Sequence, residues 1–312
     1  MDYITELTNF HMDAPSVVSL GKFDGLHRGH QKLLNKMKEL RTGAEKTAVF
    51  TFSVPPKAAL SGNGLSVLTT NEERRALLER EGIDYCVECP FIPQISHMTP
   101  EQFIREILVD RLKVKELVAG TDFHFGYRRA GDCGTLRQFA KSCGYRLHVV
   151  EKEVYEGREI SSTYVREEVK LGHMETAKAL LGYPYMIRGT VAHGRQIGRK
   201  TLGMPTVNLM PSADKLLPPN GVYVSVTRVD DLVYRGMTNI GYKPTVGGET
   251  RVGVETYLFD YEGDLYGKYI EVGLLNFERE ERRFSSMDAL KEQMEKDIQY
   301  GITYFAKNMN NL

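Results

Sequence analysis

The hydrophobic pattern of this chain changes its period near residue 182, and this change limits the folds that the chain can adopt. Before that point, short apolar runs such as residues 16–20 alternate with helical patterns such as residues 29–40. Beyond it, apolar and polar residues alternate one by one, as in residues 221–227 and 269–275. Strands that alternate with helices favour a parallel sheet with right-handed crossovers, whereas strands of period two favour an antiparallel barrel.

The length of 312 residues is long for one hydrophobic core and comfortable for two domains. We therefore predict an α/β domain with a parallel sheet over residues 1–182 and an all-β domain over residues 187–312. Glycine, proline and aspartate fill the gaps between the strands of the second domain, which predicts a small antiparallel barrel. An apolar stripe over residues 286–298 predicts that the barrel is followed by a helix.

The charge of the chain argues against two classes of partner. Lysine and arginine together number 41, and so do aspartate and glutamate, so no global field attracts the chain to nucleic acid or to a membrane surface. No apolar stretch approaches the length that spans a bilayer, and residues 1–10 lack the pattern of a signal peptide. We therefore expect a cytoplasmic protein whose partners are small molecules, and we leave its oligomeric state open.

The four cysteines suggest a reducing compartment for a chain of this size. Cys86 and Cys89 have the spacing of a metal-binding pair, but Cys133 and Cys143 do not form a second close pair. Residues 83–89 also have the pattern of a strand, in which side chains three apart point to opposite faces. We expect structural cysteines rather than a zinc site.

The turn after the first apolar run, GKFDGLHRGH at residues 21–30, has the composition of a phosphate site. A parallel sheet binds ligands beyond the carboxyl ends of its strands, and the start of a helix there favours an anion. His27 and His30 are three residues apart, so both can face one ligand, and Gly29 allows a close approach of the backbone. Asp24 would repel a bare phosphate unless Mg²⁺ lies between them. Two ordinary surface histidines are the alternative.

A second glycine-rich, basic stretch precedes the barrel strands and nearly matches a P-loop. The spacing from Gly194 to Gly198 is too short, however, Arg199 interrupts the motif, and a strand pattern follows where a P-loop requires a helix. Such a loop can still wrap phosphates through backbone amides and charge. Thr206 and Asn208 follow it two residues apart, on one strand face, with oxygen atoms suited to a magnesium ion that carries nucleotide phosphates. An ordinary polar strand face is the alternative.

Taken together, these segments resemble one known family. The turn at residues 21–30 is similar to the HxGH turn of the nucleotidyltransferase superfamily, and residues 118–132 and 160–166 are similar to further motifs of one of its branches. Residues 189–209 resemble the signature of riboflavin kinases. Over its whole length the chain therefore resembles the bacterial bifunctional riboflavin kinase/FAD synthetase family.

The resemblance implies a fold and two reactions. It implies a Rossmann-like nucleotidyltransferase domain at residues 1–182, which would transfer an adenylyl group from ATP to FMN and release FAD and pyrophosphate. It implies a Greek-key-type β-barrel at residues 187–312, which would phosphorylate riboflavin to FMN with MgATP. Mg²⁺ would be the cofactor, and ATP, riboflavin and FMN would be the small-molecule partners.

The resemblance also assigns roles to single residues. Glu255 would accept the proton of the riboflavin 5′-hydroxyl, and His27 and His30 would stabilise the charge that develops during adenylyl transfer. The FMN phosphate is already an anion, so the second reaction requires no base. Thr206 and Asn208 would bind the metal. The nucleotide-binding residues would be Gly21, Phe23, Asp24, Gly29, Asp122, Ser162, Thr163, Arg166, Gly194, Gly198, Arg199 and Gly203.

Two positions in the first half depart from the family pattern. Lys22 stands where the family usually has an asparagine, and the stretch TFSVPP at residues 51–56 lacks a histidine that is common there. Three alternative functions stay open. The chain could be a tRNA-charging or lipid-precursor nucleotidyltransferase with the same turn, a riboflavin kinase with a decayed adenylyltransferase half, or a non-catalytic flavin-binding regulator.

Overall fold

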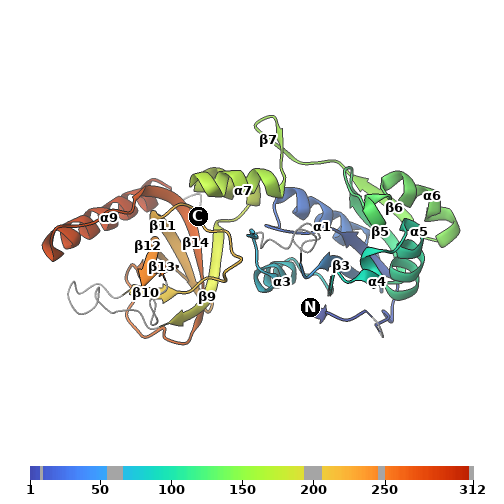
Figure 1. The fold of residues 1–312 in the computed structure, drawn as a ribbon, viewed down its shortest axis with the longest axis horizontal. Helices are drawn as coiled ribbons and strands as arrows, with labels where there is room; N and C mark the ends of the chain where they lie inside the picture. Colours follow the sequence, from blue (N-terminus) through green and yellow to red (C-terminus); the bar gives the residue numbers. More distant parts are fainter. Residues whose placement is uncertain (8–9, 55–65, 193–205, 245–249, 309–312) are drawn as a thin grey trace. The chain divides into compact units, whose positions relative to one another are not determined.

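Figure 1 shows the computed structural model of the chain, which describes residues 1–7, 10–54, 66–192, 206–244 and 250–308. The chain divides into two compact units, residues 1–162 and 163–312. The first unit is built on a parallel sheet and the second on an antiparallel barrel, so the predicted change of architecture is confirmed.

The sheet of the first unit has six strands, and all of their pairings are parallel. In spatial order the strands are β1 (Asp2–Ile4), β4 (Tyr85–Cys89), β3 (Lys46–Phe52), β2 (Ser16–Leu20), β5 (Val114–Gly120) and β6 (Arg146–Val150). The chain runs outward from β2 through β3 to β4, and then returns to the other side of β2 with β5. The strand order therefore reverses between β2 and β5, and a sheet of this kind binds its ligand in the crevice at that point.

Helices connect the parallel strands. They are α1 (Arg28–Leu40), α3 (Asn71–Arg80), α4 (Pro93–Ser96), α5 (Pro100–Gln102), the π-helix η1 (Phe103–Arg111), the 3₁₀ turn η2 (Tyr127–Arg129) and α6 (Cys133–Cys143). Capping boxes at Thr70 and Thr99 begin α3 and α5. The π-helix η1 follows α5 directly, and its residues Phe103, Ile104, Ile107 and Leu108 are all buried.

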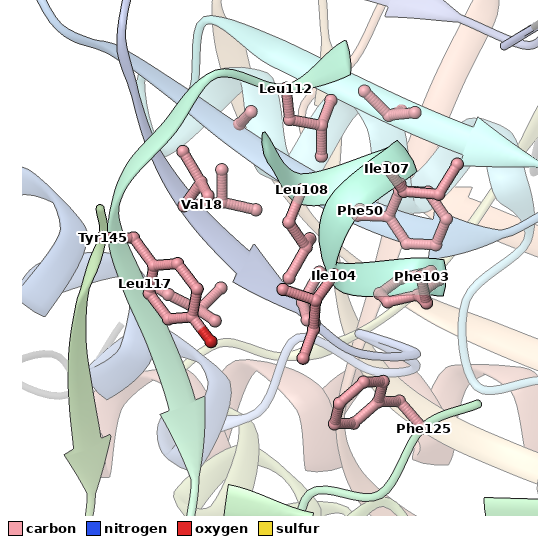
Figure 2. Close-up of a cluster of buried hydrophobic side chains, with 14 of the residues drawn as sticks. Val18, Phe50, Phe103, Ile104, Ile107, Leu108, Leu112, Leu117, Phe125 and Tyr145 are labelled. Carbon is pink, nitrogen blue, oxygen red and sulfur yellow. The ribbon is translucent and has the colours of Figure 1, made fainter. Parts of the chain in front are cut away.

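The core of the first unit lies between the sheet and η1 (Figure 2). Val18 and Leu117 come from the neighbouring strands β2 and β5, and Ile104 and Leu108 belong to the same cluster from η1. The ring of Phe125, which follows β5, joins the same cluster and lies 5.6 Å from the ring of Phe103. The loop after β5 is therefore anchored in the core, which fixes its place at the carboxyl end of the sheet.

The second unit is a closed six-stranded barrel in which every pairing is antiparallel. In spatial order the strands are β10 (Thr206–Leu209), β13 (Thr250–Leu258), β12 (Leu232–Pro244), β11 (Gly221–Val229), β14 (Tyr269–Glu280) and β9 (Tyr185–Ala192). The order β14-β11-β12-β13 is that of a Greek key, so the predicted barrel type is confirmed. Inside the barrel, buried hydroxyls of Ser225, Thr238 and Thr256 form hydrogen bonds of 2.7 and 2.8 Å.

The barrel is followed by α9 (Met287–Lys307), which is longer than the helix predicted over residues 286–298. Phe305 packs with Val224 and Met237 of the barrel and is 1% exposed. Gly301 lies so close to the barrel that a Cβ atom there would be 2.5 Å from Sδ of Met237. Beyond residue 298, the helix thus contacts the barrel through Gly301 and Phe305. Two such positions do not form a periodic pattern, so this part of the helix was not predicted.

Two helices lie between the sheet and the barrel in the sequence, α7 (Ser162–Leu171) and α8 (Met174–Leu181). The predicted first domain, residues 1–182, includes both helices, whereas the division into compact units falls between residues 162 and 163. Helix α8 packs against β9 and β14 of the barrel. A domain boundary between residues 182 and 187 remains a prediction.

The cysteines are all free, and two of them are part of the sheet. Cys86 and Cys89 on β4 are at most 1% exposed, and burial raises the pKa of their thiols to about 11 and about 12. Within the described residues, no group of three or more histidine, cysteine, aspartate or glutamate side chains could hold a metal ion. In the same part of the chain, no helix has both the length and the apolar character needed to cross a membrane.

Candidate active sites

The turn with the two histidines joins β2 to α1 at the point where the strand order reverses. His27 is the N-cap residue of α1, but its side chain makes no capping hydrogen bond, and the first turn of the helix contains no acidic residue. In contrast, α3 and α6 both begin with a capping box. The positive end of the dipole of α1 is therefore not compensated by a side chain of its own first turn, which favours an anion there.

The imidazole rings of His27 and His30 stack on each other. Their centroids are 3.7 Å apart and their planes differ by 18°. The ring of Phe23 lies on the other side, with its centroid 5.0 Å from that of His30. The Nδ1 atoms of both histidines are buried and have no hydrogen-bond partner in the structure. Two polar atoms are thus left for a ligand, because a buried polar atom without a partner costs free energy.

Burial keeps both imidazoles neutral near pH 7. Loss of hydration lowers the pKa of His27 to about 4, although its backbone and the charge of Asp122 act in the opposite direction. Loss of hydration, together with the neighbouring His27, holds the pKa of His30 well below its usual value. A neutral imidazole has one N–H donor and one acceptor. Each ring can therefore donate to a phosphate oxygen without first binding a proton.

Gly29 is required by the position of the first ring. A Cβ atom at this position would lie 3.2 Å from both Cε1 and Nδ1 of His27. A Cβ atom at Gly21 would lie 3.1 Å from the ring of Phe23. Both predicted glycines thus provide space for an aromatic ring of the turn. Gly25, with φ of 81°, has the left-handed conformation that favours glycine.

Asp24 is directed toward a neighbouring segment of the protein. Its Oδ1 accepts hydrogen bonds from the backbone N–H groups of Leu68 and Thr69, at 2.8 and 3.0 Å, and its side chain is largely buried. Its carbonyl oxygen accepts a hydrogen bond of 2.8 Å from Oγ of Ser162. The structure therefore brings together two of the predicted residues, Asp24 and Ser162, which form a hydrogen bond with each other. The sequence contained no signal for the pairing with residues 68 and 69, since it joins segments 44 residues apart.

Asp122 follows β5, on the other side of the point where the strand order reverses. Its carboxylate is exposed and forms an ion pair of 3.1 Å with Nζ of Lys152. Thr163 and Arg166 lie in the second unit, one turn apart on α7, with Thr163 exposed and Arg166 half-buried. Their part in nucleotide binding remains a prediction.

The barrel brings the three residues predicted for the kinase together. Asn208 on β10 pairs with Glu255 on β13, and Oγ1 of Thr206 donates a hydrogen bond of 2.5 Å to Oε1 of Glu255. All three side chains are half-buried. Asn239 on β12 pairs with Glu255 from the other side, and no local pattern predicts this neighbour. Paired residues of adjacent strands share one face, so the carboxylate lies between two amides.

A pocket adjoins these side chains. Thr206 and Asn208 line it together with residues from the end of β13 and from the connection to β14, namely Leu258, Tyr261, Gly263, Asp264, Leu265 and Tyr266, and with Val191 and Val207. Gly194, Gly198, Arg199 and Gly203 lie outside the described residues.

Comparison with known proteins gives the same two parts. A family model described as FAD synthetase matches residues 10–164, and one described as riboflavin kinase matches residues 181–305. A relative from Listeria monocytogenes, named bifunctional riboflavin kinase/FMN adenylyltransferase, is 35% identical over 95% of this chain and 94% of its own. A relative of the same name from Bacillus subtilis is 36% identical over 94% and 93%.

A solved structure also matches nearly the whole chain. It comes from Streptococcus pneumoniae, covers 96% of this chain and 97% of its own, and has a TM-score of 0.84 at 31% identity. Its title names it a macrolide-efflux protein, an activity that neither of the two family models describes. Since the two family models and the curated relatives agree along the whole length, the chain belongs to the bifunctional riboflavin kinase/FMN adenylyltransferase family.

Proposed function

We infer that this chain is a transferase that makes FAD from riboflavin in two consecutive reactions. The barrel phosphorylates riboflavin with ATP to give FMN, and the parallel-sheet unit transfers an adenylyl group from a second ATP to FMN, with release of pyrophosphate. The observation that carries the second assignment is the stacked pair of neutral histidines at the uncapped start of α1. It provides N–H donors and a helix dipole without a nucleophile or a base.

Adenylyl transfer needs these properties. An oxygen of the FMN phosphate attacks the α-phosphorus of ATP, a new P–O bond forms, and the bond between the α- and β-phosphates breaks. The nucleophile is already an anion, so no group has to remove a proton from it. The barrier comes from bringing anions together and from the charge that develops on pyrophosphate. We assign the stabilisation of this charge to His27 and His30, since a neutral ring can donate its N–H throughout the reaction.

The kinase reaction has the opposite need, because its nucleophile is an alcohol. We assign Glu255 as the group that accepts the proton of the 5′-hydroxyl while that oxygen attacks the γ-phosphorus of ATP and ADP leaves. The hydrogen bond from Thr206 fixes one oxygen of this carboxylate at the edge of the pocket that Thr206 and Asn208 line. General-base catalysis of this kind contributes about 10²–10⁴ in rate.

The residues of the barrel pocket fit a magnesium ion. A hydroxyl oxygen at Thr206 and an amide oxygen at Asn208 line one pocket, and both are hard ligands of the kind that Mg²⁺ accepts beside nucleotide phosphates. When bound, the ion would neutralise part of the charge on the transferred phosphoryl group. We assign Thr206 and Asn208 to hold it.

The remaining assignments of nucleotide-binding residues are also proposals. In the parallel-sheet unit, these assignments cover Gly21, Phe23, Asp24, Gly29, Asp122 and Ser162. Thr163 and Arg166 are assigned to nucleotide binding by the family resemblance alone. Asp24 would act mainly by holding the turn, because its Oδ1 already accepts two backbone hydrogen bonds. We also place the enzyme in the cytoplasm, because its four cysteines are free, as in a reducing compartment. Its partners would be ATP and flavins, the substrates of the two reactions.

Incubation of the purified protein with riboflavin and MgATP tests the proposal. Chromatography should show FMN first and FAD later. FMN alone would indicate that the parallel-sheet unit has lost its activity. Absence of both products, with flavin still bound to the protein, would favour a regulatory protein and overturn the proposal.

A further inference from the structure

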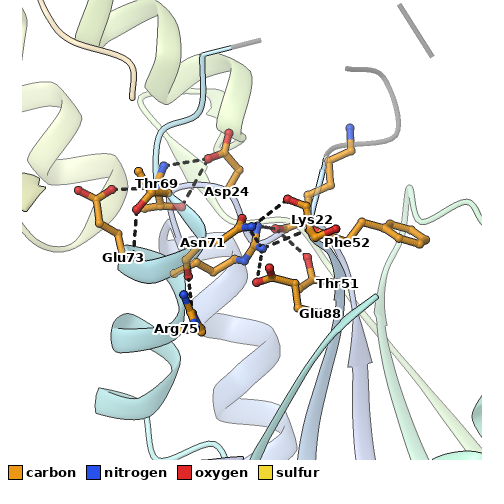
Figure 3. A network of polar contacts seen from close by, with 12 residues as sticks. Lys22, Asp24, Thr51, Phe52, Thr69, Asn71, Glu73, Arg75 and Glu88 are labelled. Carbon is orange, nitrogen blue, oxygen red and sulfur yellow. Dashed lines mark hydrogen bonds and ion pairs between the residues drawn. The ribbon is translucent and has the colours of Figure 1, made fainter. Parts of the chain in front are cut away.

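A buried ion pair lies at the carboxyl end of the sheet, outside the residues assigned so far (Figure 3). Arg74 on α3 and Glu88 on β4 are 4% and 3% exposed, and a guanidinium nitrogen of Arg74 lies 2.8 Å from Oε2 of Glu88. Removing two charges from water is costly, and such a pair often adds no net stability over an apolar pair of similar size. The role of the pair formed by Arg74 and Glu88 is therefore better sought in its contacts with the surrounding backbone than in stability.

The guanidinium of Arg74 also faces the backbone at the ends of two other strands. It donates to the carbonyl oxygen of Phe52, at 3.3 Å, and lies 3.5 Å from that of Lys22. The carbonyl of Lys22 accepts a further hydrogen bond of 3.2 Å from Oγ1 of Thr51. Lys22 follows β2, and Phe52 and Glu88 lie in β3 and β4. One side chain thus links the ends of three neighbouring parallel strands.

The segment just before Arg74 holds the same turn at a second point. Thr69 donates its backbone N–H to Asp24, and its Oγ1 accepts the backbone N–H of Gly25 at 3.0 Å. Figure 3 shows Asp24 and Lys22 on the two sides of this network. The residue between these two attachments is Phe23, whose ring lies next to that of His30.

The backbone of this turn needs outside support. Phe23 and Leu26 have φ angles of 49° and 34°, in the left-handed region that side chains other than glycine rarely adopt. Residues in such conformations persist only when their surroundings over-determine them, and they gather at functional sites. The contacts of Lys22 and Asp24 supply that support on both sides of Phe23.

We propose that Arg74 and Glu88 are positioning residues for adenylyl transfer: Glu88 orients the guanidinium of Arg74, which fixes the backbone at Lys22 and thereby the stack of Phe23, His30 and His27. The proposal rests on the function assigned above to the histidine turn. A displacement of about 1 Å at reacting groups costs about 10²-fold in rate.

Four variants separate positioning from stability. Arg74→Met should lower kcat for FAD formation from FMN by about 10²-fold, with less than a threefold change in the KM for FMN. Arg74→Lys keeps the charge beside Glu88 but loses the fork that reaches the carbonyl groups, so we expect most of the same loss. Glu88→Leu leaves a buried guanidinium without its anion and should lower both stability and kcat. The double variant Arg74→Met/Glu88→Leu replaces the pair with apolar side chains and should regain thermal stability without regaining kcat.

A matched control is available in the same sheet. Glu116 on β5 is also buried and pairs with Arg146 and His148, but it lies near the amino end of its strand. Glu116→Gln should lower thermal stability while kcat for FAD formation stays within twofold of the parent. Riboflavin phosphorylation by the barrel should stay unchanged in all these variants, which confines the effect to the parallel-sheet unit. Thermal unfolding followed by circular dichroism shows whether that unit itself is folded.

A measurement without turnover distinguishes this inference from the function on which it rests. The ring protons of His27 and His30, followed by NMR against pH, should titrate well below pH 6.5 in the parent and closer to 6.5 in Arg74→Met, since a displaced ring gains hydration. If the parent made no FAD but the titrations moved in this way, the function would be wrong and the positioning right. If the double variant regained kcat together with stability, or the titrations did not move, the inference would be overturned.

Discussion

The rings of His27 and His30 stack at 3.7 Å, and the Nδ1 atom of each is buried without a partner. A stacked pair of this kind could not stay buried if both rings were charged, because like charges repel and the desolvation of each would be large. The geometry therefore selects the neutral form. The protein thus holds two neutral, weakly basic rings in place at the start of α1.

The first prediction removes one ring. His30→Ala should lower kcat for FAD formation by about 10²–10³-fold, the usual effect of losing one preorganised donor. Formation of FMN from riboflavin should be unchanged, because the barrel does not contain this residue. Both products can be measured in one chromatographic assay. Loss of both activities in a folded variant would show that the two reactions do not have separate sites.

The second prediction concerns pH and stability. The pKa of His27 is about 4 in the folded protein and about 6.5 in an unfolded chain, so between these values the unfolded state binds more protons. The contribution of this histidine is fully present above pH 6.5, decreases as the pH falls toward 4, and is lost below that. The full difference is about 3 kcal/mol.

Urea unfolding of the parent and of His27→Gln between pH 4 and 7.5 checks this prediction. The free energy of unfolding should fall less steeply with acid in the variant, by about 3 kcal/mol over the range. Groups remote from this ring titrate equally in both proteins, so the difference reports the titration of His27 together with its effect on the neighbouring His30. Equal slopes would mean that the ring is hydrated in solution.

The third prediction concerns the carboxylate of the barrel. Glu255→Gln keeps the size of the side chain and can still accept a hydrogen bond from Thr206, but it cannot take up the proton of the riboflavin hydroxyl. The rate of FMN formation should fall by about 10²–10⁴-fold. Formation of FAD from supplied FMN should stay at the level of the parent. Asn239→Ala removes a strand neighbour of the same carboxylate and serves for comparison, with an expected loss of about tenfold or less.

Much of the architecture could be predicted, because it depends on local patterns. Period and length indicated the strand from Ser16 to Leu20 and the strand that begins at Gly221. The strand β1 has only three residues and the π-helix differs from an α-helix by hydrogen-bond pattern alone, so neither gave a sequence signal.

The sites were predictable in a similarly uneven way. Two short motifs contain the pair His27 and His30 and the pair Thr206 and Asn208. In the structure the two histidine rings stack on each other, and Thr206 and Asn208 line the same pocket. The partners that support them come from distant parts of the chain. Thr69 is 45 residues from Asp24, and Arg74 is 52 residues from Lys22. No local pattern specifies such pairs, since they depend on which strands become neighbours in the sheet.

The fourth prediction tests the space below the first ring. Gly29→Ala places a Cβ atom 3.2 Å from two atoms of His27, so the ring must move or the helix must shift. Alanine has a higher helix propensity than glycine, by about 1 kcal/mol, and this gain offsets the strain from the contact with His27. The substitution should therefore not lower the melting temperature. The rate of FAD formation should nevertheless fall by about tenfold or more, because the stack is displaced.

Gly134→Ala is the matched control for this variant, since Gly134 is also the second residue of a helix in the same unit. A Cβ atom there would lie 3.1 Å from Oδ1 of the N-cap residue Asp132, which is exposed and can shift by a few tenths of an ångström while it keeps its hydrogen bond to the backbone N–H of Thr135. We expect an unchanged rate of FAD formation and a melting temperature equal to or above that of the parent. An active Gly29→Ala enzyme would mean that the ring of His27 moves freely during the reaction, and the stacked arrangement would then not be the one that stabilises the transition state.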